Sequence, residues 1–177
     1  VDQKLVRYYQ RHYLNMDRYA FDQLLLSLIP SHVDVLKGRC GKIEKDSDLF
    51  NILIKLSNSE MQVTSRMIVG ADGGGSTVRR TFFKPIRVQY VAIQQWFKFN
   101  GQRVPYYSCV FDSKTSESCS WTIHKGDYII FGGAFKRKGC REAFDTQKSR
   151  LEEFLGNSFG DAVKTEACLV SSPRNVK

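Results

Sequence analysis

An apolar strand segment that runs directly into a glycine-rich turn constrains this 177-residue chain more than any other feature. Met67, Ile68 and Val69 lead into the six residues GADGGG, four of which are glycine. Glycine is favoured where the backbone adopts conformations that other residues resist, or where another group approaches it closely. Asp72, at the carboxyl end of the strand segment, can accept hydrogen bonds from the hydroxyls of a ribose or polyol. The pattern predicts either a binding loop or an ordinary turn closed by an Asx hydrogen bond.

The residues after this turn favour a short helix. Ser76 can cap its start, and the exposed N–H groups of a helix N-terminus attract anions. Arg79 and Arg80 would add positive charge there. The spacing matches neither the GxGxxG dinucleotide fingerprint nor the GxxxxGKS phosphate loop, so neither site is predicted.

Two longer helices are expected from their apolar spacing. Residues 15–30 place Phe21, Leu24, Leu25 and Leu28 on one face, with Asn15 or Asp17 as the cap and Pro30 ending the helix. The second helix, from Glu142 to Leu155, would turn Phe144, Leu151, Phe154 and Leu155 inward and stop at Gly156.

The remaining periodic segments predict strands. Three runs rich in β-branched residues predict a meander: 33–44, 50–56 and 61–69. Four more runs predict one antiparallel sheet: 88–99, 103–112, 118–125 and 128–135. Asn100-Gly101 is typical of a type I′ hairpin between the first two of these, and Gly126-Asp127 of a turn between the last two. Residues 162–177 read as one short strand with a frayed end.

The predicted fold class is therefore α+β, with a strand meander, a mainly antiparallel four-stranded sheet and two main helices. We place the domain boundary between residues 85 and 86.

The composition of the chain argues against several classes of protein. Hydrophobic residues make up 42% and charged residues 25%, as in ordinary globular domains, so a disordered tail or coiled coil is disfavoured. No apolar run is long enough to cross a bilayer, and no secretory signal is visible at Val1. Five scattered cysteines with no CxxC pair support neither a disulfide framework nor a zinc site, so we predict reduced thiols in a cytoplasmic protein, peripheral to a membrane at most. The net charge of +9 is compatible with an anionic partner.

The segment IVGADGGGSTVRR resembles the Asp-Gly segment, GADGxxSxVRR, of the flavoprotein hydroxylase and geranylgeranyl reductase superfamily. Upstream, NMDRYAFDQLLLSLIP is similar to a family helix whose Arg lies beside the flavin. The resemblance implies FAD as the cofactor, with Arg18 near its polar part and Gly70, Ala71, Asp72 and Gly73 near its pyrophosphate and ribose.

Downstream, SCSWTIHKGDYIIFGGAF resembles the strand pair of the geranylgeranyl reductase branch, which lines a pocket for a long apolar substrate. The resemblance implies a substrate pocket formed by Trp121, Ile123, His124 and Lys125. Ile123 and His124 depart from the Phe-Pro of that branch. No catalytic residue is assigned, because a single His in a strand is more often structural, and no metal is expected.

The resemblance further implies a fragment. The family's GxGxxG loop and its second Gly-Asp segment are both missing here, so residues 1–85 would be part of an FAD-binding domain and residues 86–177 a substrate-binding domain. FAD would be held by the full-length parent and weakly or not at all by this chain, which we expect to be inactive alone. The implied activity is hydride transfer from reduced flavin to a double bond of a hydrophobic substrate, with NAD(P)H or ferredoxin as the electron donor.

Two alternatives remain open from the residues. Within the same superfamily, the chain can belong to an oxygen-using hydroxylase or halogenase. Outside it, the basic run Lys136-Arg137-Lys138 with Arg141 can mark a non-enzymatic module that binds nucleic acid or another anion. We disfavour nucleic acid because Glu142, Asp145, Glu152 and Glu153 follow that run at once.

Overall fold

The structure is a computed structural model that describes residues 6–10, 12–84, 86, 89–101 and 107–171. In these ranges no helix has the length and apolar character needed to cross a membrane. The described residues form two compact units. One, the sheet unit, contains residues 6–9, Gly73–Gly75 and the described residues from Ile86 onward; the other, the meander unit, contains the described residues of 10–72 and 76–84.

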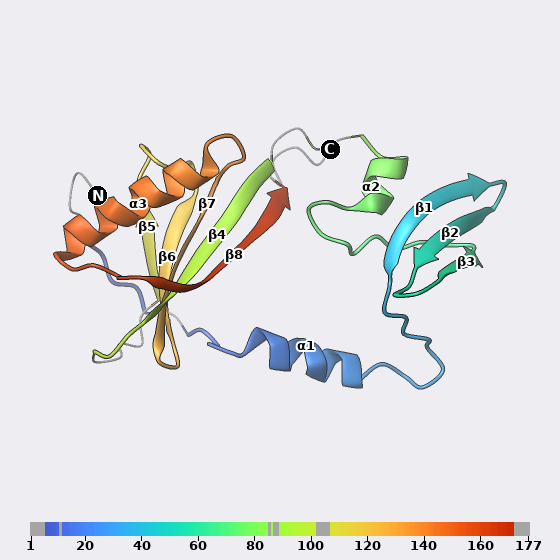
Figure 1. Cartoon of the computed structure of the whole chain (residues 1–177), viewed down its shortest axis with the longest axis horizontal. Helices are drawn as coiled ribbons and strands as arrows, with labels where there is room; N and C mark the ends of the chain where they lie inside the picture. Colours follow the sequence, from blue (N-terminus) through green and yellow to red (C-terminus); the bar gives the residue numbers. More distant parts are fainter. Residues whose placement is uncertain (1–5, 11, 85, 87–88, 102–106, 172–177) are drawn as a thin grey trace. The chain divides into compact units, whose positions relative to one another are not determined.

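A five-stranded antiparallel sheet forms the sheet unit (Figure 1). Its strands are β4 (Gln89–Lys98), β5 (Tyr107–Phe111), β6 (Cys119–Lys125), β7 (Tyr128–Lys136) and β8 (Ala162–Ser171). Their order across the sheet is β5-β6-β7-β4-β8, so β4 lies between β7 and β8 although both follow it in the chain by many residues. A position inside the sheet suits β4 because alternate residues of its second half, Ile93, Gln95 and Phe97, are buried.

The helix α3 (Cys140–Leu155) lies across one face of this sheet (Figure 1). A cluster of buried aromatic and aliphatic side chains fills the space between them: Ile93, Phe97, Phe131, Phe135, Phe144 and Leu151. The ring of Phe159, after the helix, stacks on Phe97 at 5.1 Å and on Phe131 at 5.7 Å between centroids. Burial of large aromatic rings is the main stabilising contribution here.

A partly buried ion pair holds α3 against the turn between β5 and β6. Asp112, 6% exposed, accepts a hydrogen bond of 2.6 Å from Nε of Arg150. The hydroxyl of Thr115 donates to the amide oxygen of Gln147, which is also on α3. This polar contact fixes the position of the turn against the helix.

The meander unit contains a three-stranded antiparallel sheet, β1 (Arg39–Asp46), β2 (Leu49–Lys55) and β3 (Glu60–Ser65), in sequence order. It also contains α1 (Arg18–Ser27) and the short α2 (Thr77–Phe82). Phe82 of α2 meets Phe50 of β2 edge to face, with 5.4 Å between ring centroids, and the helix is thereby anchored to the meander.

The α+β class, the meander and the two main helices are confirmed. Asp17 is the N-cap of α1 and accepts from the N–H of Ala20, and Gly156 is the C-cap of α3 with φ of 66°, as predicted. Ser76 caps α2, since its Oγ accepts a hydrogen bond of 3.0 Å from the N–H of Arg79.

Three predictions about the strands are wrong in detail. The sheet has five strands because β8 is a ten-residue strand paired with β4 along its length. Asn100-Gly101 does not join paired strands, since β4 pairs with β7 and β8 while β5 pairs with β6; residues 102–106 lie outside the described residues. The third meander strand ends at Ser65, so Met67–Val69 is not part of it.

The inward faces of the helices were predicted only in part. Phe144 and Leu151 of α3 are buried, but Leu155 is 53% exposed because the helix ends there. On α1, Leu24, Leu25 and Leu28 are 48 to 68% exposed. No described element of the meander unit buries this apolar face of α1.

Candidate functional site

The Asp-Gly loop is organised by the side chain of Asp72. Its Oδ2 accepts a hydrogen bond of 2.6 Å from the N–H of Thr77, the first residue of α2. A side-chain hydrogen bond with Ser76 is the main reason that the pKa of Asp72 lies below its usual value, and the bond to Thr77 adds to it. The carboxylate is therefore charged at neutral pH, oriented by the loop and exposed to solvent.

Two of the N–H groups at the start of α2 are already used by the protein. Thr77 donates to Asp72 and Arg79 donates to Ser76. The helix is six residues long. An anion at this helix start would therefore have to compete with the side chains of Asp72 and Ser76 for these N–H groups.

The four glycines of the loop have different physical roles. A Cβ on Gly70 would lie 2.8 Å from Cβ of Val78, so glycine lets α2 pack closely on the preceding segment. Gly73 has φ of 75°, in the left-handed region that glycine tolerates. A Cβ on Gly74 would lie 2.1 Å from the carbonyl oxygen of Leu169 on β8, so glycine is required for this contact. Around Gly75 there is open space.

This loop fits an approaching polar group. Built Cβ atoms at Gly73 and Gly75 meet nothing within 4 Å, and both residues are exposed. The exposed carboxylate of Asp72 is the kind of acceptor that a ribose or polyol hydroxyl needs. The residues present are thus compatible with the predicted flavin contact.

Arg18 lies elsewhere in the meander unit. It is the first residue of α1, and its Nε donates a hydrogen bond of 3.0 Å to Asp22, one turn further along. Its side chain is 78% exposed. The described residues show no contact between Arg18 and the Asp-Gly loop, so its place beside a flavin remains a prediction.

The second candidate region is the face of the five-stranded sheet that α3 does not cover. Because side chains alternate along a strand, the register assigns each strand residue to one face. The uncovered face, called the open face below, includes these residues: Gln94, Trp96 and Lys98 of β4, Cys109 of β5, Cys119, Trp121, Ile123 and Lys125 of β6, Tyr128, Ile130 and Gly132 of β7, and Lys164, Glu166 and Cys168 of β8.

Trp121 and its neighbours on β6 and β7 make this part of the open face apolar. A Cβ on Gly132 would lie 2.5 Å from the indole of Trp121, so the ring lies directly over the β7 backbone. In the next row Ile123 is paired with Ile130, which is 4% exposed. Three of the four residues predicted for the substrate pocket, namely Trp121, Ile123 and Lys125, share this face.

His124 does not share it. Its position in β6 directs it to the face covered by α3, where its ring meets that of Phe99 edge to face at 4.6 Å. The alternation of strand residues separates it from its two neighbours. A pocket formed by all four predicted residues is therefore not assembled.

An aromatic and charged cluster lies toward one end of the open face. The Nζ atoms of Lys125 and Lys164 lie 5.7 and 5.3 Å from the ring centroid of Trp96. Such distances allow cation–π attraction between each lysine and the Trp96 ring. Tyr128 meets Trp96 edge to face at 5.9 Å.

Glu166 fixes the orientation of this cluster. Its Oε2 accepts from Nε1 of Trp96 at 2.8 Å and from Nε2 of Gln94 at 2.7 Å, and its Oε1 pairs with Nζ of Lys164 at 2.6 Å. Lys164 first, then Gln94 and Trp96, lower the pKa of Glu166 to about 2. The carboxylate is thus ionised at all physiological pH values and holds the indole in one position.

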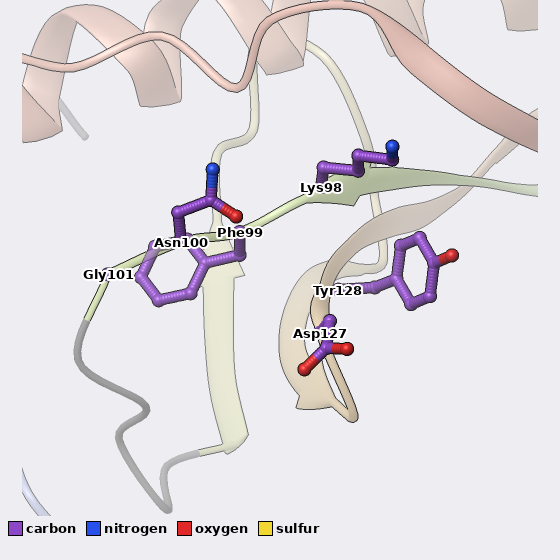
Figure 2. Close-up of a pocket in the computed structure, with 6 residues that line it drawn as sticks. All are labelled: Lys98, Phe99, Asn100, Gly101, Asp127 and Tyr128. Carbon is purple, nitrogen blue, oxygen red and sulfur yellow. The ribbon is translucent and has the colours of Figure 1, made fainter.

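A hollow of about 550 Å³ adjoins the same end of the sheet (Figure 2). The side chains of Lys98, Phe99, Asn100, Asp127 and Tyr128 line it, together with Gly101. Lys98 and Tyr128 are directly opposite each other on β4 and β7. The hollow therefore continues the charged end of the open face.

The thiols of Cys109 and Cys119 lie diagonally across β5 and β6 on this face. Burial, followed by the neighbouring thiol of Cys109, raises the pKa of Cys119. All five cysteines of the chain are free thiols in the structure. Within the described residues, no group of three or more metal-ligating side chains is present.

Glu166, Gln94 and Lys164 were missed by the sequence reasoning. The signal for them was present in part, because alternation along 162–171 already predicts that Lys164 and Glu166 share a face. Their neighbours on β4 follow only from the pairing of β8 with β4, which no local pattern encodes.

Comparison with known proteins identifies relatives that are longer than this chain. Protein CbrA of Shigella dysenteriae serotype 1 (strain Sd197) is 43% identical over 171 residues, covering 96% of this chain and 48% of that protein. The chain spans about half the length of the curated relatives it matches. No family model matches it.

Solved structures with the same fold include two flavin-related proteins. The flavin-dependent brominase Bmp2, as a triple mutant, matches 86% of this chain and 44% of its own with a TM-score of 0.61 at 19% identity. A geranylgeranyl bacteriochlorophyll reductase-like protein from Thermoplasma acidophilum matches 73% of this chain and 35% of its own with a TM-score of 0.53 at 16% identity. Over these regions the chain has the α+β fold found in flavin-dependent enzymes.

Proposed function

We propose that the chain is the central part of an FAD-dependent oxidoreductase that acts on a hydrophobic small molecule. The observation that carries the proposal is the Asp-Gly loop, GADGGGSTVRR, placed in a fold shared with flavin-dependent enzymes. The exposed positions of Gly73 and Gly75 and the exposed, charged Asp72 support it.

In the proposed enzyme, Asp72 and the backbone of Gly73 would hold the ribose and pyrophosphate part of FAD, and Arg18 would lie near the same polar part. The flavin supplies hydride or activates oxygen when it is bound. The open face supplies a rigid apolar surface at Trp121 and Ile123 against which a substrate can be oriented. Orientation of this kind raises reaction rates by removing unproductive arrangements.

Reduction of a double bond is our first choice of reaction. It rests on the strand pair 118–135, in which Trp121 and Lys125 match the geranylgeranyl reductase pattern and lie on one face. A halogenase or hydroxylase reaction is the second candidate, since the brominase shares more of the chain than the reductase-like protein does. Product formation without oxygen distinguishes the reductase from both oxygen-using alternatives.

The first test is the cofactor content of the full-length natural protein that contains this chain. We expect a yellow protein whose bound flavin is released on denaturation as FAD. Asp72→Ala should lower the ratio of flavin to protein, because it removes both the hydroxyl acceptor and the contact that orders the loop. A colourless protein that takes up no FAD would refute the proposal.

Two further variants separate binding from folding. Asp72→Asn keeps an oxygen that can accept from Thr77 but removes the charge, so the loop should remain ordered. Asp48→Ala, in the exposed turn between β1 and β2, removes a carboxylate from the same unit and should leave the flavin content unchanged. If both Asp72 variants retain full flavin content, Asp72 has only a structural role.

NAD(P)H or ferredoxin as electron donor, and a cytoplasmic location peripheral to a membrane, are further parts of the proposal. The rate at which each donor reduces the bound flavin under anaerobic conditions distinguishes the two donors.

A further inference from the structure

Two of the five thiols lie close together at one edge of the five-stranded sheet. In the pairing of β5 with β6, Cys109 is opposite Trp121 and Phe111 is opposite Cys119. The two cysteines are therefore diagonal neighbours on the same face of two paired strands. Their side chains turn toward each other, since a hydrogen bond between the thiols contributes to the pKa of Cys119.

The two thiols differ in how easily a molecule in solution reaches them. Cys109 is exposed and Cys119 is half-buried. Burial, followed by the neighbouring thiol of Cys109, raises the pKa of Cys119, so this thiol keeps its proton at neutral pH. Because the thiolate is the reactive form of cysteine, Cys119 is the poorer first nucleophile. An oxidant in solution therefore meets Cys109 first.

The position of β5 allows the two sulfur atoms to approach further. A disulfide needs the Cβ atoms at roughly 3.5–4.5 Å, and diagonal neighbours lie farther apart than opposed ones. Within the described sheet β5 is an edge strand whose one partner is β6. A small shift of β5 toward Cys119 thus disturbs the pairing of one strand pair alone.

We propose that Cys109 and Cys119 form a reversible redox pair, which hydrogen peroxide converts to a disulfide between β5 and β6. The sulfur of Cys109 attacks one peroxide oxygen, the O–O bond breaks, and a sulfenic acid and one water form. The thiol of Cys119 then attacks the sulfur of Cys109, the S–O bond breaks, and the S–S bond forms as a second water leaves. Two thiols and one peroxide give one disulfide and two waters, and two electrons pass from sulfur to oxygen.

A dithiol reductant reverses the reaction by thiol–disulfide exchange, in which its two thiols become a disulfide and both cysteines regain their protons. While the bridge is closed, it holds the edge strand to β6 next to Trp121, the residue opposite Cys109. The inference goes beyond the proposed function and does not rest on it, because neither step uses a flavin.

Cys168 provides an internal control. It is exposed and lies on the same open face, on β8. However, β4 and β7 separate β8 from β6, and three strand spacings amount to roughly 14 Å. This is too far for a bridge to Cys119. Oxidation of Cys168 therefore reports that the peroxide has reached an exposed thiol that lacks a neighbouring cysteine.

Peptide mapping of the full-length natural protein that contains this chain tests the pair. The reduced protein is treated with hydrogen peroxide at rising concentration until Cys168 is oxidised, and the remaining thiols are alkylated. Trypsin cleaves after Arg103, Lys114 and Lys125, so the two cysteines fall in separate peptides, 104–114 and 115–125. We expect these peptides to be joined, with a mass equal to their sum less two hydrogens, and to separate after treatment with dithiothreitol.

Cys119→Ser is the diagnostic variant, because serine keeps the size of the side chain and removes the second thiol. It should lose the joined peptide and accumulate a sulfenic acid at Cys109, which dimedone labels. The wild-type protein should show little of this label, since Cys119 consumes the sulfenic acid. Cys168→Ser is the matched control and should form the joined peptide as the wild type does.

Separate peptides in the wild-type protein, at a peroxide concentration that oxidises Cys168, would overturn the inference. Equal dimedone labelling of Cys109 in the wild type and in Cys119→Ser would also overturn it. So would a bridge between two copies of the chain, which non-reducing electrophoresis detects as a dimer. Flavin content enters none of these outcomes, so a colourless protein that forms the joined peptide removes the oxidoreductase proposal alone.

Discussion

The two faces of the five-stranded sheet differ in what covers them. On the covered face, side chains such as Phe97, Phe131 and Phe135 are fully buried beneath α3. On the open face, Trp96 and Trp121 are only partly buried although their side chains are larger. The same strands supply both sets, because alternate residues point in opposite directions. One face therefore forms the core of the unit, and the large side chains of the other are only partly buried within the described chain.

The largest expected effect tests the covered face. Phe131→Ala should lower the free energy of unfolding by about 3–5 kcal/mol, because it leaves a cavity among Phe97, Phe144 and Phe159. Trp121→Ala on the open face should cost only about 1–2 kcal/mol, because the ring is partly exposed already. Urea denaturation of both variants measures the difference. Equal losses would contradict the division of the two faces.

Two glycine substitutions test the contact between the Asp-Gly loop and β8, the edge strand of the sheet. Gly74→Ala should destabilise the protein by about 2–3 kcal/mol, since the new methyl group would collide with the Leu169 carbonyl of β8. Gly75→Ala, one residue further, should be close to neutral because it points into open space. Thermal unfolding of the pair measures the cost of that contact. A neutral Gly74→Ala would mean that the loop does not lie against β8.

A pH experiment tests the polar network of the open face. The folded-state pKa of Glu166 is about 2, below its ordinary value of 4.5, so its bonds contribute stability fully above pH 4.5. That contribution is lost as the pH falls from 4.5 toward 2. Because the side chain is 39% exposed, solvent screening reduces the cost of Glu166→Gln at pH 7 to about 1 kcal/mol. The gap between wild type and variant in urea midpoint should shrink between pH 4.5 and pH 2; a constant gap would contradict the network.

The smallest effect on stability is expected at Arg18. Its exposed pair with Asp22 should contribute less than about 0.5 kcal/mol, so Arg18→Ala should unfold at nearly the same urea concentration as the wild type. If Arg18 also lies beside the flavin, the same variant lowers the flavin content of the full-length protein. Unchanged stability together with unchanged flavin content would remove Arg18 from the site.

Local patterns predicted most of the elements. Asp17, Ser76 and Gly156 mark helix ends by chemistry that acts within one turn, and the structure confirms all three. The sequence could also have predicted the face on which His124 lies, because His124 alternates with Ile123 and is out of phase with Trp121 in β6. The strand partners could not be predicted from local patterns. The pairing of β4 with β8 joins residues about 70 positions apart and depends on packing across the whole unit.

The position of β4 also determines when the sheet can form. It is made before β7 and β8 yet needs both as neighbours, and β8 ends at Ser171. During synthesis β4 therefore leaves the ribosome as an unpaired, largely apolar strand, and pairings between sequence-distant strands form slowly. A chain released before residue 162 would keep one side of β4 exposed and would be prone to aggregate through it.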